Sequence, residues 1–147
     1  MAAVRIQYGV LPYRLSPAGD LQILLLTTRR TGRWSIPKGW PIKGLKPPKS
    51  AAREAYEEAG LRGTVGGRAI GSFAYVKTVE GETALRCEVR VFPLAVKKQL
   101  ISWPEGAQRD TAWLTASDAL AVVDKAELRP IIEKFAARFA RRNGRDG

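Results

Sequence analysis

One segment near the middle of the chain carries the sequence signals of a helix at both of its ends. Its first turn can accept Pro48, because proline has a fixed, helix-compatible φ and that turn does not use its N–H group. Gly60 suits the left-handed conformation that ends many helices, and the apolar Leu61 follows it. A helix that stops at Gly60, with strand-like runs on both sides, predicts a chain that mixes helices and strands.

The runs before this helix are typical of strands. Gln7 to Leu15 and Leu21 to Thr27 are joined by Ser16 to Asp20, a stretch with the residues of a hairpin turn. The second run contains three consecutive leucines, Leu24 to Leu26, so it is apolar on both faces and we expect it inside the sheet. A short strand at Trp34 to Ile36 and a loop from Lys38 to Pro47 are expected next.

Further strands and helices are expected after Gly60. The expected strands are Ala69 to Val79, Thr83 to Val96 and Thr111 to Leu114, with a turn at Glu80 to Glu82. A helix is expected over Ser117 to Val123 with Ser117 as its N-cap, and another over Glu127 to Arg141 with a core stripe of Ile131, Phe135 and Phe139. This order predicts one α/β domain over residues 1–147, a mixed sheet flanked by helices.

The composition excludes several kinds of catalytic site. The chain has no His, so it cannot use a Ser-His-Asp or Cys-His relay or a His-containing zinc site. Its one cysteine, Cys87, excludes intrachain disulfides and Cys-x-x-Cys sites, and its strand-like surroundings indicate a packed thiol. An enzyme with this composition must use carboxylates, amines, hydroxyls and a bound metal ion.

Three glutamates lie at helical spacing within the predicted helix. Glu54 is followed at i+3 by Glu57 and at i+4 by Glu58, so the three carboxylates share one face. Their mutual repulsion would be relieved by a hard divalent cation, which prefers oxygen ligands and binds substrate phosphates as well. A solvated acidic helix face is the alternative interpretation of the glutamates taken alone.

Positive charge precedes these glutamates. The chain carries 25 Lys and Arg against 14 Asp and Glu, a net charge of +11, and has no acidic residue from Leu21 to Arg53. Eight cations lie in that stretch: Arg29, Arg30, Arg33, Lys38, Lys43, Lys46, Lys49 and Arg53. Gly39-x4-Gly44 begins like a Walker A loop, but Leu45 and Lys46 stand where Lys and Ser or Thr are required. The pattern predicts a site for a phosphorylated substrate.

A second basic cluster, Arg138, Arg141, Arg142 and Arg145, is typical of a solvated helix end.

The segment from Gly39 to Leu61 resembles the Nudix box, the 23-residue signature G-x5-E-x7-R-E-U-x-E-E-x-G-U in which U is aliphatic. The matching residues are Gly39, Arg53, Glu54, Glu57, Glu58, Gly60 and Leu61, with Ala55 as a small apolar residue at the first U. Leu45 departs from the signature, since it replaces the first Glu, which in the family helps to orient the box Arg. Arg53 then needs another partner, and we expect Glu57, one turn away, to serve.

The resemblance implies the Nudix fold and hydrolysis of a nucleoside diphosphate linked to another group, or of a related pyrophosphate, with Mg²⁺ or Mn²⁺. The implied metal ligands are Glu54, Glu57, Glu58 and the carbonyl of Gly39. Water attacks phosphorus with the metal's help, and Glu54 is the first candidate for the base, with Glu105 as the second. Four cations are expected to stabilise charge on the substrate: Arg29, Lys38, Lys43 and Arg109.

Residues outside the box indicate which subgroup of the family the chain resembles. Arg33 to Gly39, Trp103 to Glu105, Arg109 and Trp113-Leu114 look similar to the subgroup that acts on diphosphoinositol polyphosphates and diadenosine polyphosphates. A small-molecule polyphosphate is therefore the expected partner. Most of the four tryptophans are expected to cover the core or the sheet, although Trp40 lies in a polar loop and can face a ligand.

A binding module without catalysis is the alternative to an enzyme. In that reading the fold senses a nucleotide or holds RNA through its basic surface, and Leu45 marks a decayed enzyme. The three intact glutamates argue against it, and a nucleic-acid partner is not favoured. No apolar run approaches the roughly 20 residues that span a bilayer, and the first residues lack a signal peptide's long apolar region, so we expect a cytoplasmic protein with no membrane partner.

Overall fold

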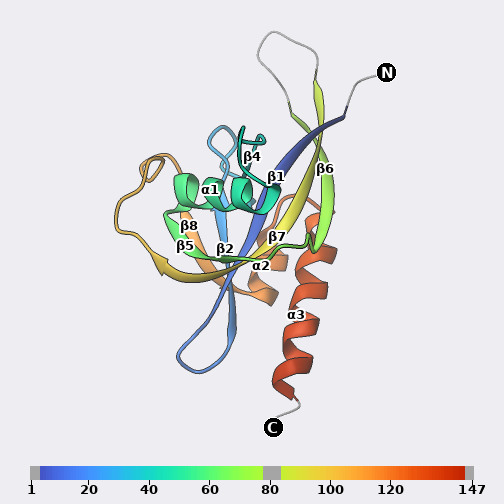
Figure 1. The fold of residues 1–147 in the computed structure, drawn as a ribbon. Helices are drawn as coiled ribbons and strands as arrows, with labels where there is room; N and C mark the ends of the chain where they lie inside the picture. The colour runs from blue at the N-terminus through green and yellow to red at the C-terminus, as the bar shows by residue number, and fades with distance from the viewer. Residues whose placement is uncertain (1–3, 78–83, 145–147) are drawn as a thin grey trace.

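The computed structural model describes residues 4–77 and 84–144, and their strands form one mixed sheet (Figure 1). The central strands, β1 (Val4–Leu15) and β7 (Leu85–Gln99), run parallel over ten residue pairs. The other pairings are antiparallel. The remaining strands are β2 (Leu21–Thr27), β3 (Trp34–Ser35), β4 (Lys38–Gly39), β5 (Leu61–Val65), β6 (Gly71–Lys77) and β8 (Thr111–Thr115). The path β3-β2-β1-β7-β5 forms the sheet, while β4 pairs with β1, β6 with β7 and β8 with β2.

Helices cover both faces of this sheet, as the sequence predicts. On one face lies α1 (Pro47–Ala59), whose Ala51, Ala55 and Ala59 pack against Val10 and Leu24. On the other face lie α2 (Ala116–Val122) and α3 (Leu128–Gly144), which pack against the alternate residues of the same strands (Figure 1). Small alanines at i, i+4 and i+8 let α1 approach the sheet closely. Leu24 to Leu26 are all buried, which confirms an interior strand.

Most expected elements are present, with some differences in their limits. The hairpin turn is confirmed, since Gly19 is left-handed and donates its N–H to the Ser16 carbonyl. Gly60 ends α1 with φ 69°. The turn expected at residues 80–82 lies outside the described residues. β5 was not expected, because its exposed centre, Arg62 to Thr64, lacks the apolar alternation of a strand.

Two expectations at element ends are wrong. Lys38 and Gly39 were expected in a loop, but they form β4, pairing with Gly9 and Tyr8 of β1. The adjacent Pro37 carbonyl accepts the Val10 N–H, which fixes the chain beside β1. The N-cap of α2 is Thr115 and not Ser117, because the Thr115 hydroxyl accepts the Asp118 N–H. The N-cap therefore lies two residues earlier than expected, at the end of β8.

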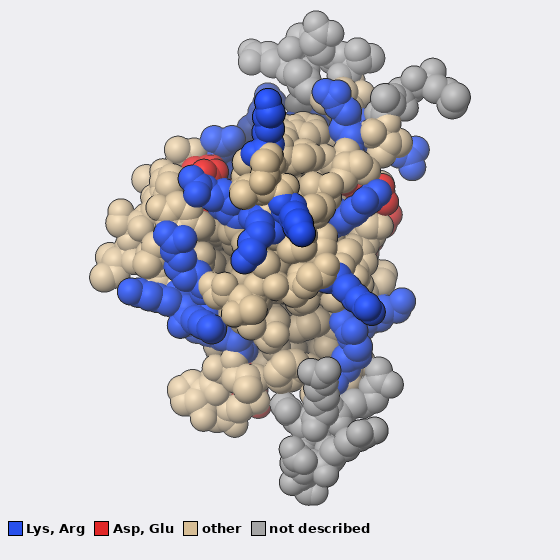
Figure 2. All heavy atoms as spheres, in the orientation of Figure 1, with Lys and Arg blue, Asp and Glu red and all other residues tan. Residues whose placement is uncertain are grey.

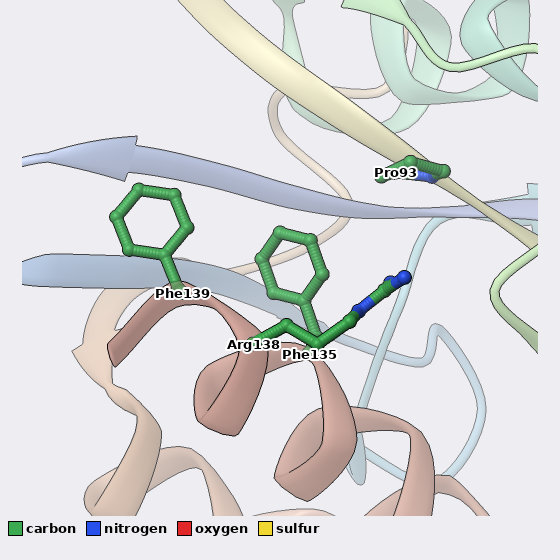
Figure 3. Close-up of a pocket in the computed structure, with 4 residues that line it drawn as sticks. All are labelled: Pro93, Phe135, Arg138 and Phe139. Atoms are coloured by element: carbon green, nitrogen blue, oxygen red, sulfur yellow. The ribbon is translucent and has the colours of Figure 1, made fainter. Parts of the chain in front are cut away.

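The core beneath α3 contains the expected aromatic stripe. Ile131 and Phe135 are buried, and Phe139 packs on the same cluster. Figure 3 shows the two Phe rings directed from α3 toward the strands, where with Pro93 of β7 they line a pocket of about 200 Å³. Cys87 is a buried free thiol, as expected. Among the described residues, no helix combines the length and the apolar character needed to cross a bilayer.

Candidate active site

The three glutamates of α1 lie at the edge of the buried alanine stripe. Glu58 is buried, with an exposed fraction of 5%, where residues 100–110 between β7 and β8 pack against it through Trp103 and Arg109. Glu54 is half-buried one turn earlier. The Glu57 side chain is 35% exposed. The solvated acidic face that was the alternative interpretation therefore does not describe this helix, since one carboxylate is buried and a second is partly buried.

β4 brings a backbone segment against Glu54. A Cβ atom added at Gly39 would lie 2.5 Å from Glu54 Oε1, so a side chain at this position would force the Glu54 carboxylate to move. Gly39 is held beside Glu54 by its pairing with β1, in which Tyr8 lies opposite the glycine. The first glycine of the box thus permits close approach of a strand and a carboxylate.

Burial raises the pKa values of two carboxyls, those of Glu54 and Glu58. Burial raises the pKa of Glu58 to about 8, and the neighbouring Glu54 adds to this rise, while Arg109 and Lys38 oppose it. Burial also raises the pKa of Glu54, with further contributions from Glu57 and Glu105. Loss of water is the main cause for both carboxyls, whereas the hydrogen bond between them raises the pKa of Glu58 and lowers that of Glu54. A divalent cation between them would stabilise the ionised forms.

Two arginines contact the carboxylates of Glu57, Glu58 and Glu105. Arg53 Nε donates to Glu57 Oε1 at 3.3 Å, which confirms the expected replacement partner. Arg109 Nε donates to Glu105 Oε1 at 3.1 Å, and Arg109 Nη2 lies 3.8 Å from Glu58 Oε1. Within the described ranges, no three acidic, His or Cys side chains converge on one point as they stand. The oxygen donors suit a hard cation, and Glu54, Glu58 and the Gly39 backbone are already adjacent, whereas Glu57 is turned toward Arg53.

A basic cleft of about 640 Å³ opens beside the pair formed by Glu54 and Glu58. It lies between the 28–33 loop, β6 and the turn after α2, and Lys38 and Arg109 form its side nearest Glu58. Among the described residues that line it, Asp124 is the acidic one and seven are cations: Arg29, Arg30, Arg33, Lys38, Lys77, Arg109 and Lys125. Figure 2 shows how strongly Lys and Arg outnumber acidic side chains on the face that carries α1.

The structure brings together three of the four predicted substrate cations. Arg29, Lys38 and Arg109 line the cleft, whereas Lys43 is exposed on the loop before α1 and is outside the lining. Of the eight cations before the glutamates, Lys43, Lys46, Lys49 and Arg53 do not line the cleft. Half of the basic run therefore lies outside the cleft, on the loop before α1 and on α1 itself.

Sequence reasoning missed two parts of the site. Lys77 and Lys125 come from β6 and the turn after α2, far along the chain from the box, and no local pattern marks them. Trp103 was expected to cover the core or the sheet, yet its indole N–H donates to the Glu58 carbonyl of α1 at 3.2 Å. Trp34 packs on the core below α3 and Trp113 on the core below α1, as expected, and Trp40 is 39% exposed.

Comparisons with known proteins agree with this geometry. Residues 8–139 match the family model described as NUDIX domain. The chain is 29% identical to Nudix hydrolase 12, mitochondrial, of Arabidopsis thaliana over 146 residues, 89% of this chain and 72% of that protein. It is 31% identical to mouse diphosphoinositol polyphosphate phosphohydrolase 3-alpha over 106 residues, 71% of this chain and 60% of that protein.

A solved structure shows the same fold. The binary complex of the C. elegans Ap4A hydrolase has a TM-score of 0.68 to this chain at 24% identity, covering 92% of this chain and 98% of the other. The box residues, the mixed sheet between helices and the match along residues 8–139 lead to one conclusion. The chain belongs to the Nudix family and is a hydrolase of that family.

Proposed function

We propose that the protein is a pyrophosphohydrolase that uses Mg²⁺ or Mn²⁺ to cleave a phosphoanhydride bond in a polyphosphate substrate. The observation that carries the proposal is that the cation-rich cleft and the glutamates of α1 lie next to each other. Lys38 and Arg109 line the cation-rich cleft and also act on the charge of Glu58. A bound polyphosphate can therefore place its chain in the cleft and its reacting phosphorus beside the glutamates.

The proposed metal ligands are Glu54, Glu57, Glu58 and the carbonyl of Gly39. Support comes from the close approach of Gly39 to Glu54 and from the raised pKa values of Glu54 and Glu58. When bound, the metal ion would supply charge stabilisation at phosphorus and a more acidic water. Glu57 would exchange its contact with Arg53 for the ion, which an exposed pair permits at low cost.

Glu54 is the preferred general base. Among the described residues no salt bridge joins Glu54 to a cation, and its raised pKa suits a group that accepts a proton. Glu105, the second candidate, contacts Arg109 at 3.1 Å and Arg29 at 3.9 Å. Those arginines favour a role for Glu105 in holding cations in place, so its candidacy as the base is weaker.

The cleft favours a compact, heavily phosphorylated ring as substrate. Its cations come from four separate parts of the chain and surround the space, which suits phosphates that point in several directions. Tyr75 is the one aromatic residue among the described lining residues, and its ring is approached by Lys38 Nζ at 5.1 Å and Lys125 Nζ at 5.6 Å. Two cations therefore compete with a base for this ring, and the described lining offers no other. A diphosphoinositol polyphosphate is therefore preferred.

Diadenosine polyphosphate is the second candidate substrate, and one observation favours it. Trp40 is partly exposed, and Lys77, which lines the cleft, lies with its Nζ 5.1 Å from the Trp40 ring centre. An adenine could stack on that ring while its phosphates enter the cleft. Trp40→Ala would then weaken hydrolysis of the dinucleotide and leave the inositol substrate unaffected.

A panel assay tests the function. Purified protein with Mg²⁺ or Mn²⁺ is given diphosphoinositol phosphates, diadenosine polyphosphates, nucleoside triphosphates and nucleotide sugars, and phosphate products are measured. Release from at least one compound is expected. Absence of any product, together with RNA binding that weakens steeply with salt, would favour the non-catalytic binding module instead. A cytoplasmic location is proposed as well, and cell fractionation tests it, since some relatives are named mitochondrial or chloroplastic.

A further inference from the structure

The strap, residues 100–110 between β7 and β8, closes the C-terminal end of α1 together with Gln99. A helix leaves its last carbonyls without partners inside the helix. Here four consecutive carbonyls are each satisfied from this one segment. Glu57 accepts from Glu105 N at 3.0 Å, Glu58 from Trp103 Nε1 at 3.2 Å, Ala59 from Gln99 Nε2 at 3.1 Å and Gly60 from Leu100 N at 2.8 Å.

Trp103 is seated directly on the helix terminus. Its ring lies against Gly60, where an added Cβ would come within 2.5 Å of Trp103 Cε3. Gly60 is left-handed as well, with φ 69°, so the position combines two requirements that glycine meets. The indole ring thus lies over Gly60, and its N–H donates to the Glu58 carbonyl.

With Trp103 held in this position, the charged residues of the strap lie beside the carboxyls of Glu54 and Glu58. Arg109, whose side chain is 11% exposed, lies 3.8 Å from Glu58 Oε1, donates to Glu105, and donates from Nη1 to the Thr27 carbonyl at 3.2 Å. Glu105 is held at its backbone by Glu57 and at its side chain by Arg109. Glu57 and Glu58 thus contact the strap through their backbone carbonyls, and Glu58 also does so through its carboxylate.

We propose that Trp103 is a positioning residue, which fixes the strap on α1 so that Arg109 and Glu105 stand at a set distance from Glu58. The proposal rests on the proposed function for its effect on turnover. Trp103 contacts α1 through the Glu58 backbone carbonyl and through Gly60. It acts through the backbone of α1 and through the strap, as outer residues around metal sites do.

Trp103→Phe tests the proposal, because Phe keeps a ring over Gly60 and removes the N–H donor. The matched control is Ile101→Ala, which changes a fully exposed residue of the same strap. We expect Trp103→Phe to lower kcat about tenfold with KM unchanged, to weaken Mn²⁺ binding measured by calorimetry by a similar factor, and to speed hydrogen exchange of the Glu105 amide. Ile101→Ala should match the wild type in all three.

The outcomes separate the two proposals. Unchanged kcat, Mn²⁺ affinity and Glu105 exchange in a folded Trp103→Phe variant would overturn the role of Trp103. If wild type hydrolyses nothing in the panel, the proposed function fails, while Mn²⁺ binding and exchange still decide the role of Trp103. Should the variant not fold, exchange in the wild type decides: the Glu105 and Leu100 amides must be protected as strongly as the Gly60 amide of α1, and much faster exchange contradicts the proposal.

Discussion

Arg53 Nε donates a hydrogen bond to Glu57 Oε1 across 3.3 Å, one turn apart on α1. This contact explains how the chain tolerates Leu45 at the place of the first glutamate of the box. The leucine is 43% exposed, and the arginine takes a carboxylate from its own helix as its partner. The consequence is that one proposed metal ligand is shared with an arginine.

Arg53→Gln should therefore affect turnover more than stability. The pair is exposed, so the free energy of unfolding should fall by only about 0.2–1 kcal/mol. Turnover should fall roughly tenfold, because Glu57 loses the contact that orients it. Denaturant unfolding and steady-state kinetics measure both. Lys49→Gln, which removes an exposed cation one turn earlier, is the control and should change neither quantity.

Glu57→Gln should leave folding intact and reduce turnover by at least about tenfold. The side chain is partly exposed and its ion pair is weak, so the neutral amide fits the same space. A neutral side chain, however, is a poor ligand for a divalent cation. Circular dichroism checks the fold and the panel assay checks turnover. Wild-type turnover in this variant would remove Glu57 from the proposed ligands.

Gly39→Ala should disturb the metal site through Glu54. The new methyl would collide with the Glu54 carboxyl, so that side chain must move away from Gly39. Mn²⁺ affinity and turnover should each fall about tenfold or more. Gly67→Ala is the matched control, since its Cβ meets nothing within 4 Å and its φ is not left-handed. Equal behaviour of the two variants would contradict the close contact between Gly39 and Glu54.

Without divalent cations the protein should lose stability as pH rises from about 4.5 to about 8. The pKa of Glu58 is raised from its usual 4.5 to about 8, so the folded state holds this proton more tightly than the unfolded state does. Stability from this group is full below about 4.5 and is lost through that window. The raised pKa of Glu54 acts in the same direction, while the lowered pKa of Lys38 acts in the opposite one.

Thermal unfolding from pH 5 to 8.5, with EDTA or with Mg²⁺, measures this effect. Mg²⁺ should raise the unfolding midpoint more at high pH, because it binds the ionised carboxylates. Glu58→Gln should flatten the pH dependence in EDTA, since glutamine does not titrate. An equally steep fall in stability in that variant would mean that another group is responsible.

Lys125→Gln should raise KM for a polyphosphate substrate about fivefold and leave kcat unchanged, as expected for a partly exposed charge contact of roughly 1 kcal/mol. The residue lines the cleft and is not one of the proposed metal ligands. Lys134→Gln on α3, which does not line the cleft, is the control. Higher salt should reduce the difference between the variant and the wild type, because exposed charges are screened.

The sequence by itself determined the helix with its glutamates, its Gly60 terminus, the central strands and the Arg53–Glu57 pair. Each of these depends on local rules: proline and glycine at helix ends, apolar alternation in strands, and side chains one turn apart that must meet. The exposed strand β5 and the two-residue β4 carry no such local signal, since their pairing with β7 and β1 is decided by tertiary contacts.

Only the tertiary structure decided which charges share a site. Lys77 and Lys125 join Arg29 in the cleft because β6 and the turn after α2 pack beside the 28–33 loop, whereas Lys43 remains outside. Trp103 reaches the Glu58 carbonyl because the strap folds back across 45 residues of chain onto α1. Spacing along a helix predicts neighbours one turn apart, but contacts between distant segments depend on how the whole sheet is assembled.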